Sequence, residues 1–305
     1  MINIERSEKE KIDLFHFLMD GMSKFSEKNY KEAIDDYTKA LGIDPDAAIA
    51  YLYRGKCRTG LEQYEEAIED FTKVIEIDPN DGRPYLSRGR LTLRKGNYEF
   101  AIKDFTKVIE IDPNFADTYY YLGKARISLK QYEDGINDLN KSIELNPDNP
   151  NCDNAYYYLG KARMDLKQYQ DAIKDFTKVI EMHPDDAVDA YYRRGLAKMD
   201  LKQYQDAIKD FTKVIEIDPY FDDAYYRRGL AKMELKQYQD AEEDITKIKE
   251  LDQYQNAVDD LSKLLETYPN DVNCLSLRAS AKRKLGDNKG ADEDDKKADK
   301  LKNIL

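Results

Sequence analysis

Side chains that could carry out catalysis are few in this sequence, apart from carboxylates. The only histidines are His16 and His183, and the three cysteines form no CxxC pair, so neither a catalytic dyad nor a zinc site is indicated. The phosphate-binding and hydrolase motifs GxxxxGK[ST], GxGxxG, HExxH and GxSxG do not occur. The aspartates and glutamates recur periodically, which favours solvated helix faces over paired catalytic carboxylates. We therefore expect no enzyme activity, no metal and no cofactor.

Tyrosine is the unusual residue, with 24 copies, many of them near lysine or arginine. A surface of tyrosine and basic side chains suits an extended peptide, because the rings stack and hydrogen-bond while the cations pair with charge. The alternative is that these side chains only coat a structural wall. Binding of a peptide is thus the chemistry that the residue types favour.

The charge balance of the 305-residue chain narrows the choice of partner. It has 49 basic and 61 acidic side chains and a net charge of −12, a sign that repels the phosphates of nucleic acids. The first twenty residues carry mixed charges ahead of a short apolar run, unlike a secretory leader or a membrane span. Three scattered cysteines suit a reducing compartment. We expect a cytoplasmic protein that binds neither nucleic acid nor membrane.

The elements that must position the tyrosines are organised around one repeated stretch. It reads YQDAIKDFTKVIEIDP from Tyr204 to Pro219. Close copies start at Tyr30, Tyr64, Tyr98, Tyr132 and Tyr169, and poorer ones at Tyr238 and Tyr254. Ala207, Phe211 and Val214 fall on one apolar face at helical spacing, and the Asp-Pro step ends the helix. Each copy is therefore predicted to be an amphipathic helix, here named helix B.

A second apolar-periodic run, helix A, precedes each copy and is centred on a glycine. From each glycine to the next proline there are 24 residues, as from Gly55 to Pro79. This constancy predicts a rigid helical hairpin. A glycine within a helix costs about 0.5–1 kcal/mol relative to alanine, so its recurrence indicates a contact where a side chain would not fit. Small residues of helix B, such as Ala67 and Ala101, are the expected partners.

With a period of 34 and two antiparallel helices per period, the sequence resembles the tetratricopeptide repeat family. The family positions in one period are Tyr51, Arg54, Gly55, Ala67, Phe71 and Pro79. The chain departs from the family pattern by using tyrosine in place of tryptophan, and by Gly135 and Leu139 in its fourth period. The resemblance implies an all-α fold, a right-handed superhelical solenoid of antiparallel helix pairs.

Spacing breaks divide the predicted array. Residues 1–252 are expected to form seven repeats, with a longer loop near 148–153. Only 16 residues separate Tyr238 from Tyr254, so a helix A is missing and one long or gently kinked helix is predicted over 240–268. Residues 253–305 are expected to form an irregular helix and a degenerate terminal repeat that caps the stack and continues the array.

The resemblance implies that the A helices line a concave groove. The chain is thus expected to be a non-catalytic interaction scaffold that binds an extended peptide or protein segment in this groove, and an acidic segment is one candidate. The residues expected to line it are Lys56, Arg90, Tyr120, Lys124, Tyr157, Lys161, Tyr192, Arg193, Tyr226 and Arg227. One alternative is self-association through the C-terminal part, where the helix A is missing. A nucleic-acid-binding helical repeat is a weaker alternative, because the chain is acidic.

Overall fold

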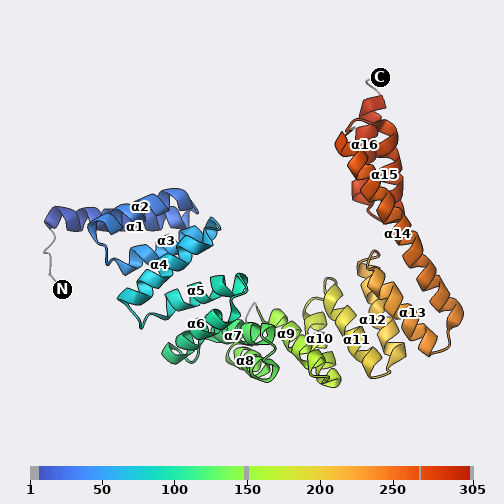
Figure 1. Cartoon of the computed structure of the whole chain (residues 1–305), viewed down its shortest axis with the longest axis horizontal. Coiled ribbons are helices and arrows are strands. Elements are labelled where there is room, and N and C mark those ends of the chain that lie inside the picture. The colour runs from blue at the N-terminus through green and yellow to red at the C-terminus, as the bar shows by residue number, and fades with distance from the viewer. Residues whose placement is uncertain (1–6, 148–150, 268, 303–305) are drawn as a thin grey trace. The chain divides into compact units, whose positions relative to one another are not determined.

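The chain folds into α-helices throughout the part that the computed structural model describes, residues 7–147, 151–267 and 269–302 (Figure 1). The all-α prediction is confirmed. Two compact units are formed, here called the N-terminal unit (Met1–Tyr158) and the C-terminal unit (Leu159–Leu305). The helices of the N-terminal unit are α1 (Glu8–Ser26), α2 (Tyr30–Ile43), α3 (Ala48–Gly60), α4 (Tyr64–Ile77), α5 (Gly82–Arg94), α6 (Tyr98–Ile111), α7 (Ala116–Ser128) and α8 (Tyr132–Leu145).

The boundary between the units falls within α9 (Cys152–Asp165). The further helices of the C-terminal unit are α10 (Tyr169–Met182), α11 (Val188–Asp200), α12 (Tyr204–Ile217), α13 (Asp222–Glu234), α14 (Tyr238–Thr267), α15 (Val272–Lys284) and α16 (Asn288–Lys302). The predicted longer loop lies between α8 and α9, and its residues 148–150 are outside the described part.

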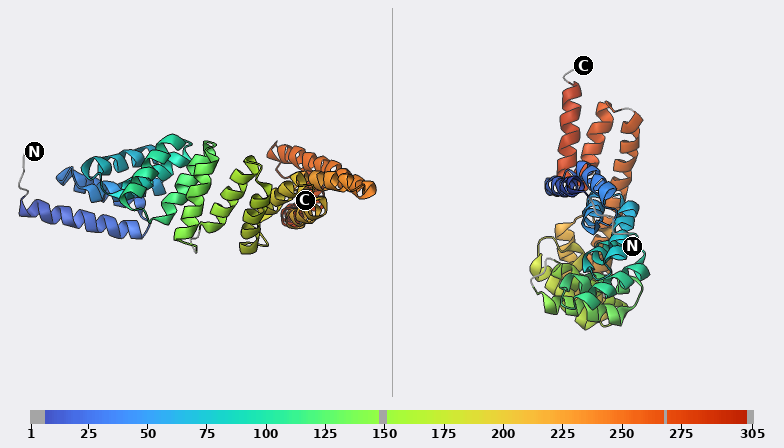
Figure 2. Two further views of the ribbon diagram at one scale, coloured as in Figure 1. Left: turned by 90° about the horizontal axis from the view of Figure 1, so that it is seen from below. Right: turned by 90° about the vertical axis from the view of Figure 1, so that its left-hand side faces the viewer.

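Within each unit, helices that follow one another in the chain pack as antiparallel pairs (Figures 1 and 2). Each B helix begins at the repeated tyrosine, as predicted; these are the even-numbered helices from α2 to α14. The B helices that are followed by an Asp-Pro step end just before this step. The aspartate of this step closes the turn with its side chain. Asp78 Oδ1 accepts a hydrogen bond from the amide of Asn80 at 3.0 Å, and Asp112 Oδ1 does the same for Asn114.

In most A helices the repeat glycine makes room for an aromatic ring, so the nearest neighbour of the glycine is this ring and not the expected alanine. A Cβ atom on Gly89 would lie 2.7 Å from Phe105 Cε1, and one on Gly55 would lie 2.8 Å from Phe71 Cε1. Both rings are buried. A backbone contact occurs in the fourth period, where a Cβ on Gly123 would lie 2.8 Å from the carbonyl oxygen of Gly135. The phenylalanine ring is larger than the alanine side chain and fills more of the interface between helices A and B.

A buried aspartate in each B helix forms an ion pair with the preceding A helix, and sequence reasoning had not found this network. The aspartates are Asp36, Asp70, Asp104, Asp138, Asp175, Asp210, Asp244 and Asp294. In α5, the Arg88 guanidinium donates to both carboxylate oxygens of Asp104 at 2.8 and 2.9 Å, and to Thr72 Oγ1 of α4 at 2.9 Å. One arginine thus joins helices of two successive pairs.

The region that lacks a turn signal is a single helix, α14, of 30 residues. It packs against α13 and α15, and its C-terminal part lies beside α15 in Figure 1. The boundary that the sequence predicts between residues 252 and 253 falls within α14, and the grouping into seven repeats and a terminal cap stays a prediction. No helix in the described ranges is both long enough and apolar enough to cross a membrane.

Candidate functional site

A cavity of about 370 Å³ opens on the A helices of the N-terminal unit, between α3 and α5. Its lining residues are Phe25, Lys56, Thr59, Phe71, Ser87, Arg90, Leu91 and Arg94. Most of these come from two consecutive A helices, which expose their positive side chains on this face because the B helices cover the other one. We call this cavity the basic cavity. It contains two of the predicted groove residues, Lys56 and Arg90.

The three cations of the basic cavity lie over tyrosine rings. Lys56 Nζ is 4.8 Å from the centroid of Tyr53, and the guanidinium carbon of Arg90 is 5.0 Å from that of Tyr121. Arg94 lies 4.9 Å from the ring of Tyr64. Such contacts contribute about 0.5–1 kcal/mol each at exposed sites and hold the charged groups in place.

These cations carry uncompensated charge. Among the residues that the structure describes, Lys56, Arg90 and Arg94 have no carboxylate within ion-pair distance, whereas most arginines of the A helices are paired with an aspartate. Burial, together with repulsion by Arg83, lowers the pKa of the Lys56 ammonium, and attraction by the Asp81 carboxylate opposes this shift. Three cations that line one cavity without forming an ion pair favour an anionic ligand.

The cation–tyrosine contacts continue along the N-terminal unit. Lys124 Nζ lies 5.1 Å from the ring centroid of Tyr158, and the rings of Tyr157 and Tyr158 are 5.7 Å apart. Tyr157 and Lys124 are half-buried, so part of each side chain reaches the surface. The structure therefore brings these two predicted residues into one tyrosine-rich surface.

Tyr120 is a correction to the predicted site. Its side chain is 5% exposed and packs edge-on against Tyr121 and Tyr158, with centroids 5.1 and 6.4 Å away. Burial raises the pKa of its hydroxyl. The ring of Tyr120 thus lies between neighbouring A helices. It supports the surface without lining it.

The predicted residues of the C-terminal unit are more dispersed. Tyr192 packs against Phe211 and Phe221, with centroids 5.9 and 5.0 Å away, so its ring fills space between helices. Arg193 Nε is held by Asp189 at 2.9 Å on its own helix. Lys161 is half-buried on α9. The structure places these three residues in packing or in local pairs.

Tyr226 and Arg227 do remain close to each other in the C-terminal unit. Tyr226 is 48% exposed, and the guanidinium carbon of Arg227 lies 5.8 Å from its ring centroid. Of the predicted groove residues in the C-terminal unit, this pair places a cation beside an exposed ring.

Sequence reasoning missed the tyrosines that hold the cations, Tyr53, Tyr121 and Tyr158. Each of them lies two residues after the tyrosine that is equivalent to Tyr51 in its repeat, so this regular spacing was visible in the sequence. Arg94 was also missed, although it lies one turn after Arg90 on the same helical face. In α3, α7 and α9, the tyrosine that a cation lies over is therefore one residue after the predicted position.

The described part of the chain contains no cluster of three or more His, Cys, Asp or Glu residues that could hold a metal ion. Cys57 and Cys152 are buried thiols that form no disulfide, and burial raises the pKa of Cys57 to about 12. A thiol held in its neutral form is a poor nucleophile.

Comparison with protein families gives one consistent result. Profiles described as tetratricopeptide repeat match residues 21–47, 48–81, 116–149, 154–186, 188–221 and 222–254, and a profile described as TPR repeat matches residues 89–129. No curated protein matches the chain.

Solved structures with a similar fold cover the larger part of the chain. A crystal structure of MamA protein is 29% identical with a TM-score of 0.54, covering 57% of this chain and 93% of that one. YrrB, described as a TPR protein with an unusual peptide-binding site, is 24% identical with a TM-score of 0.54, covering 60% and 93%. A tetratricopeptide repeat protein from Parabacteroides merdae is 18% identical with a TM-score of 0.56, covering 78% and 93%. The last two show the fold alone.

Proposed function

Because the chain belongs to the tetratricopeptide repeat family, we propose that it is a non-catalytic scaffold that binds an extended peptide segment along the A helices of its N-terminal unit. The observation that carries this proposal is the basic cavity, where Lys56, Arg90 and Arg94 face a space of about 370 Å³ without a carboxylate partner among the described residues. The thiols of Cys57 and Cys152, which form no disulfide, support a cytoplasmic location as part of the proposal.

The cations and rings of this cavity suit a segment that carries carboxylates. A charge-assisted hydrogen bond contributes about 1.5–3 kcal/mol, and arginine can hold a carboxylate with two parallel bonds. The tyrosines already hold Arg90 and Lys56 in place, so less side-chain entropy is lost when the ligand binds. The net charge of −12 disfavours anionic ligands elsewhere on the chain, so the basic cavity is the favoured place for one.

The test is a selection of random linear peptides on the immobilised full chain, followed by fluorescence anisotropy of the enriched peptides. Reversal of charge in the double variant Lys56→Glu/Arg90→Glu should weaken their binding by at least about 100-fold, because two attractions become repulsions. Binding should also weaken as salt is raised.

The matched control is Lys103→Glu, which reverses a charge on the exposed face of α6 in the same unit. It should leave peptide affinity within about twofold, because an exposed charge away from the site is screened. Peptides that bind the double variant as tightly as the natural chain would place the binding site elsewhere, and the absence of any enriched peptide would argue against peptide binding.

A second proposal is self-association through the C-terminal unit. Leu277 on α15 is 59% exposed, which is among the highest values for a large apolar side chain in the described residues. Sedimentation equilibrium should then show a dimer that Leu277→Ser dissociates. A monomer at all concentrations would remove this proposal without affecting the first.

A further inference from the structure

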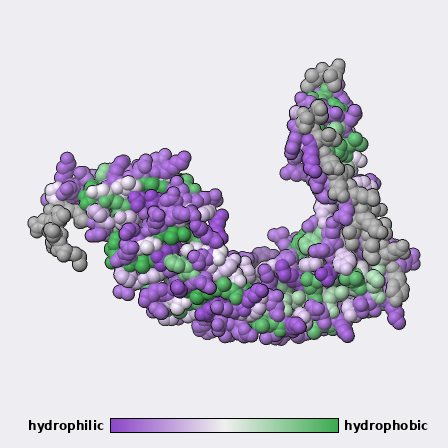
Figure 3. Space-filling model, viewed as in Figure 1, coloured by the Kyte–Doolittle hydropathy of each residue, from purple (hydrophilic) through white to green (hydrophobic). Residues whose placement is uncertain are grey.

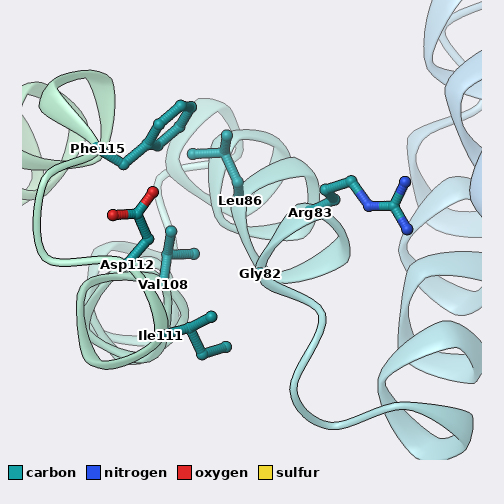
Figure 4. A pocket seen from close by; sticks show the side chains of 7 residues that line it. All are labelled: Gly82, Arg83, Leu86, Val108, Ile111, Asp112 and Phe115. Atoms are coloured by element: carbon teal, nitrogen blue, oxygen red, sulfur yellow. The ribbon is translucent and has the colours of Figure 1, made fainter.

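A second cavity of about 220 Å³ lies at the start of α5, and its wall is almost entirely apolar (Figure 4). The residues that line it are Gly82, Arg83, Leu86, Val108, Ile111, Asp112 and Phe115. Figure 4 shows Leu86, Val108 and Phe115 around one space, while the Arg83 side chain points away from it. Arg83 is held by both carboxylate oxygens of Asp81. We call this space the apolar cavity.

The apolar cavity leaves large side chains in contact with solvent. Phe115 is 39% exposed and Ile111 is 36% exposed, although both belong to the junction between α6 and α7. The face of the N-terminal unit shown in Figure 3 is mostly hydrophilic, with separate hydrophobic patches. Exposed apolar side chains around a concave space are typical of a binding site for an apolar group.

The C-terminal unit contains the equivalent site with a tyrosine ring against its phenylalanine, and we call this site the filled copy. The residues at the same repeat positions as Gly82, Leu86, Val108, Ile111 and Phe115 are Val188, Tyr192, Val214, Ile217 and Phe221. There the ring of Tyr192 lies 5.0 Å from that of Phe221, and Ile217 and Phe221 are half-buried. The two copies differ in that Gly82 and Leu86 replace valine and tyrosine. The apolar cavity is therefore the space that a tyrosine ring takes in the filled copy.

The glycine that helps to open this space is not required by packing. A Cβ atom on Gly82 would lie 3.7 Å from Val108 and 3.9 Å from Ile111, which are ordinary contact distances. By contrast, a Cβ on Gly89 in the same helix would lie 2.7 Å from Phe105. The fold would accept a larger residue at position 82, so the cavity does not follow from the packing of α5 on α6.

We propose that the apolar cavity receives one aromatic side chain of an acidic peptide segment, and that carboxylates of the same segment pair with the cations of the basic cavity. This inference rests on the proposed function. Helix α5 carries both sites, since Leu86 lines the apolar cavity and Arg90 and Arg94 line the basic one. The charge of the basic cavity selects an acidic segment, and the filled copy shows that an aromatic ring fits.

The geometry of α5 sets the spacing within the ligand. Arg90 and Arg94 follow Leu86 by one and two turns, about 6 and 12 Å along the axis at 1.5 Å per residue. An extended peptide advances about 3.3 Å per residue. The aromatic residue and the acidic residues of the ligand should therefore be about two to four positions apart.

The experiment uses the random peptides selected on the full chain, and a variant that copies the filled cavity, Gly82→Val/Leu86→Tyr. The enriched peptides should share an aromatic residue two to four positions from an acidic one. The filled variant should bind them at least about tenfold more weakly, because the ring of the ligand loses its place. Its thermal unfolding midpoint should be equal to or above that of the natural chain.

Two controls separate binding from folding. Gly42→Ala, at a position with open space around it on α2, should change stability without changing affinity. If the filled variant does not fold, Ile111→Ser replaces it, because this partly exposed wall residue can become polar without disturbing the buried core. The same peptides with the aromatic residue changed to alanine should bind the natural chain and either cavity variant equally.

Two results would overturn the inference while leaving the proposed function intact. One is a set of enriched peptides without a shared aromatic residue, and the other is unchanged affinity for the filled variant, or for Ile111→Ser where that variant replaces it. A selection that enriches no peptide would instead contradict both the inference and the proposed function.

Discussion

At the scale of single residues, the buried aspartates differ in how many cations they face. Asp70 is paired with Arg54 and Arg58, each at 2.7 Å. Asp138 is paired with Arg126 at 2.7 Å, and the position equivalent to Arg54 in that repeat is Leu122. Burial therefore dominates at Asp138 and raises the pKa of its carboxyl from 3.8 to about 6.

This raised pKa makes the stability of the N-terminal unit depend on pH. The folded chain binds the Asp138 proton more tightly than the unfolded chain, so protonation stabilises the fold, and this contribution is lost as the pH rises from about 4 through about 6. The free energy of unfolding of the natural chain, relative to Asp138→Asn, should fall across this window by on the order of 2 kcal/mol. Urea unfolding at several pH values measures it, and a difference that is flat or rises with pH would contradict the assignment.

Two glycines of one helix provide a matched pair for a second prediction. Gly82→Ala should raise the free energy of unfolding by about 0.4–1 kcal/mol, because the added methyl group meets only ordinary contacts and the unfolded chain loses freedom. Gly89→Ala should lower it by about 1–3 kcal/mol, because the methyl group would overlap the ring of Phe105. Thermal unfolding of both variants provides the measurement, and shifts of the same sign would show that helix propensity outweighs packing.

At the scale of helices, the network around Arg88 connects α5 to both of its neighbours. Arg88→Ala leaves the buried Asp104 carboxylate without its partner and removes the bond to Thr72. The expected loss of stability is about 3–5 kcal/mol, typical of a buried charge whose partner has been removed. Chemical denaturation followed by circular dichroism measures this loss.

The control is the double variant Arg88→Met/Asp104→Leu, in which no charge stays buried. It should recover most of the loss, because apolar side chains of similar size can replace a buried ion pair at little cost. If the double variant is as unstable as Arg88→Ala, the contribution of Arg88 lies in the contact with Thr72 and in packing on the ring of Phe100, 4.9 Å away.

At the scale of the whole molecule, contacts between helices join neighbours in the chain, or the next helix but one, as for α5 and α7. In such an array, stability is close to a sum of repeat and interface contributions. A local change should therefore remain local. Arg88→Ala should raise amide hydrogen exchange in α4 to α6 and leave the protection of α11 to α13 unchanged. Uniform loss of protection over both units would show that the chain unfolds as one cooperative body.

Much of the architecture followed from the sequence alone. The recurrence of tyrosine, the apolar period of helix B and the following proline predicted where the B helices from α2 to α12 begin and end, because these signals are local to the backbone. The missing turn likewise predicted one long or gently kinked helix, and the structure shows a continuous α14. A period of 34 residues then determined the pairing of neighbouring helices, since only short loops connect them.

The direction of single side chains within these helices was decided only by the tertiary structure. Tyr120 and Tyr192 occupy the same repeat position as Leu86, yet the tyrosines are packed against other rings while the leucine borders an open cavity. The three residues share one repeat position. Whether the side chain is packed or borders a cavity depends on the volume of the side chains that the next pair of helices places against it. The sequence also did not show which cations lack an ion-pair partner. Ion pairs such as that of Arg88 with Asp104 join residues that are 16 positions apart on two different helices.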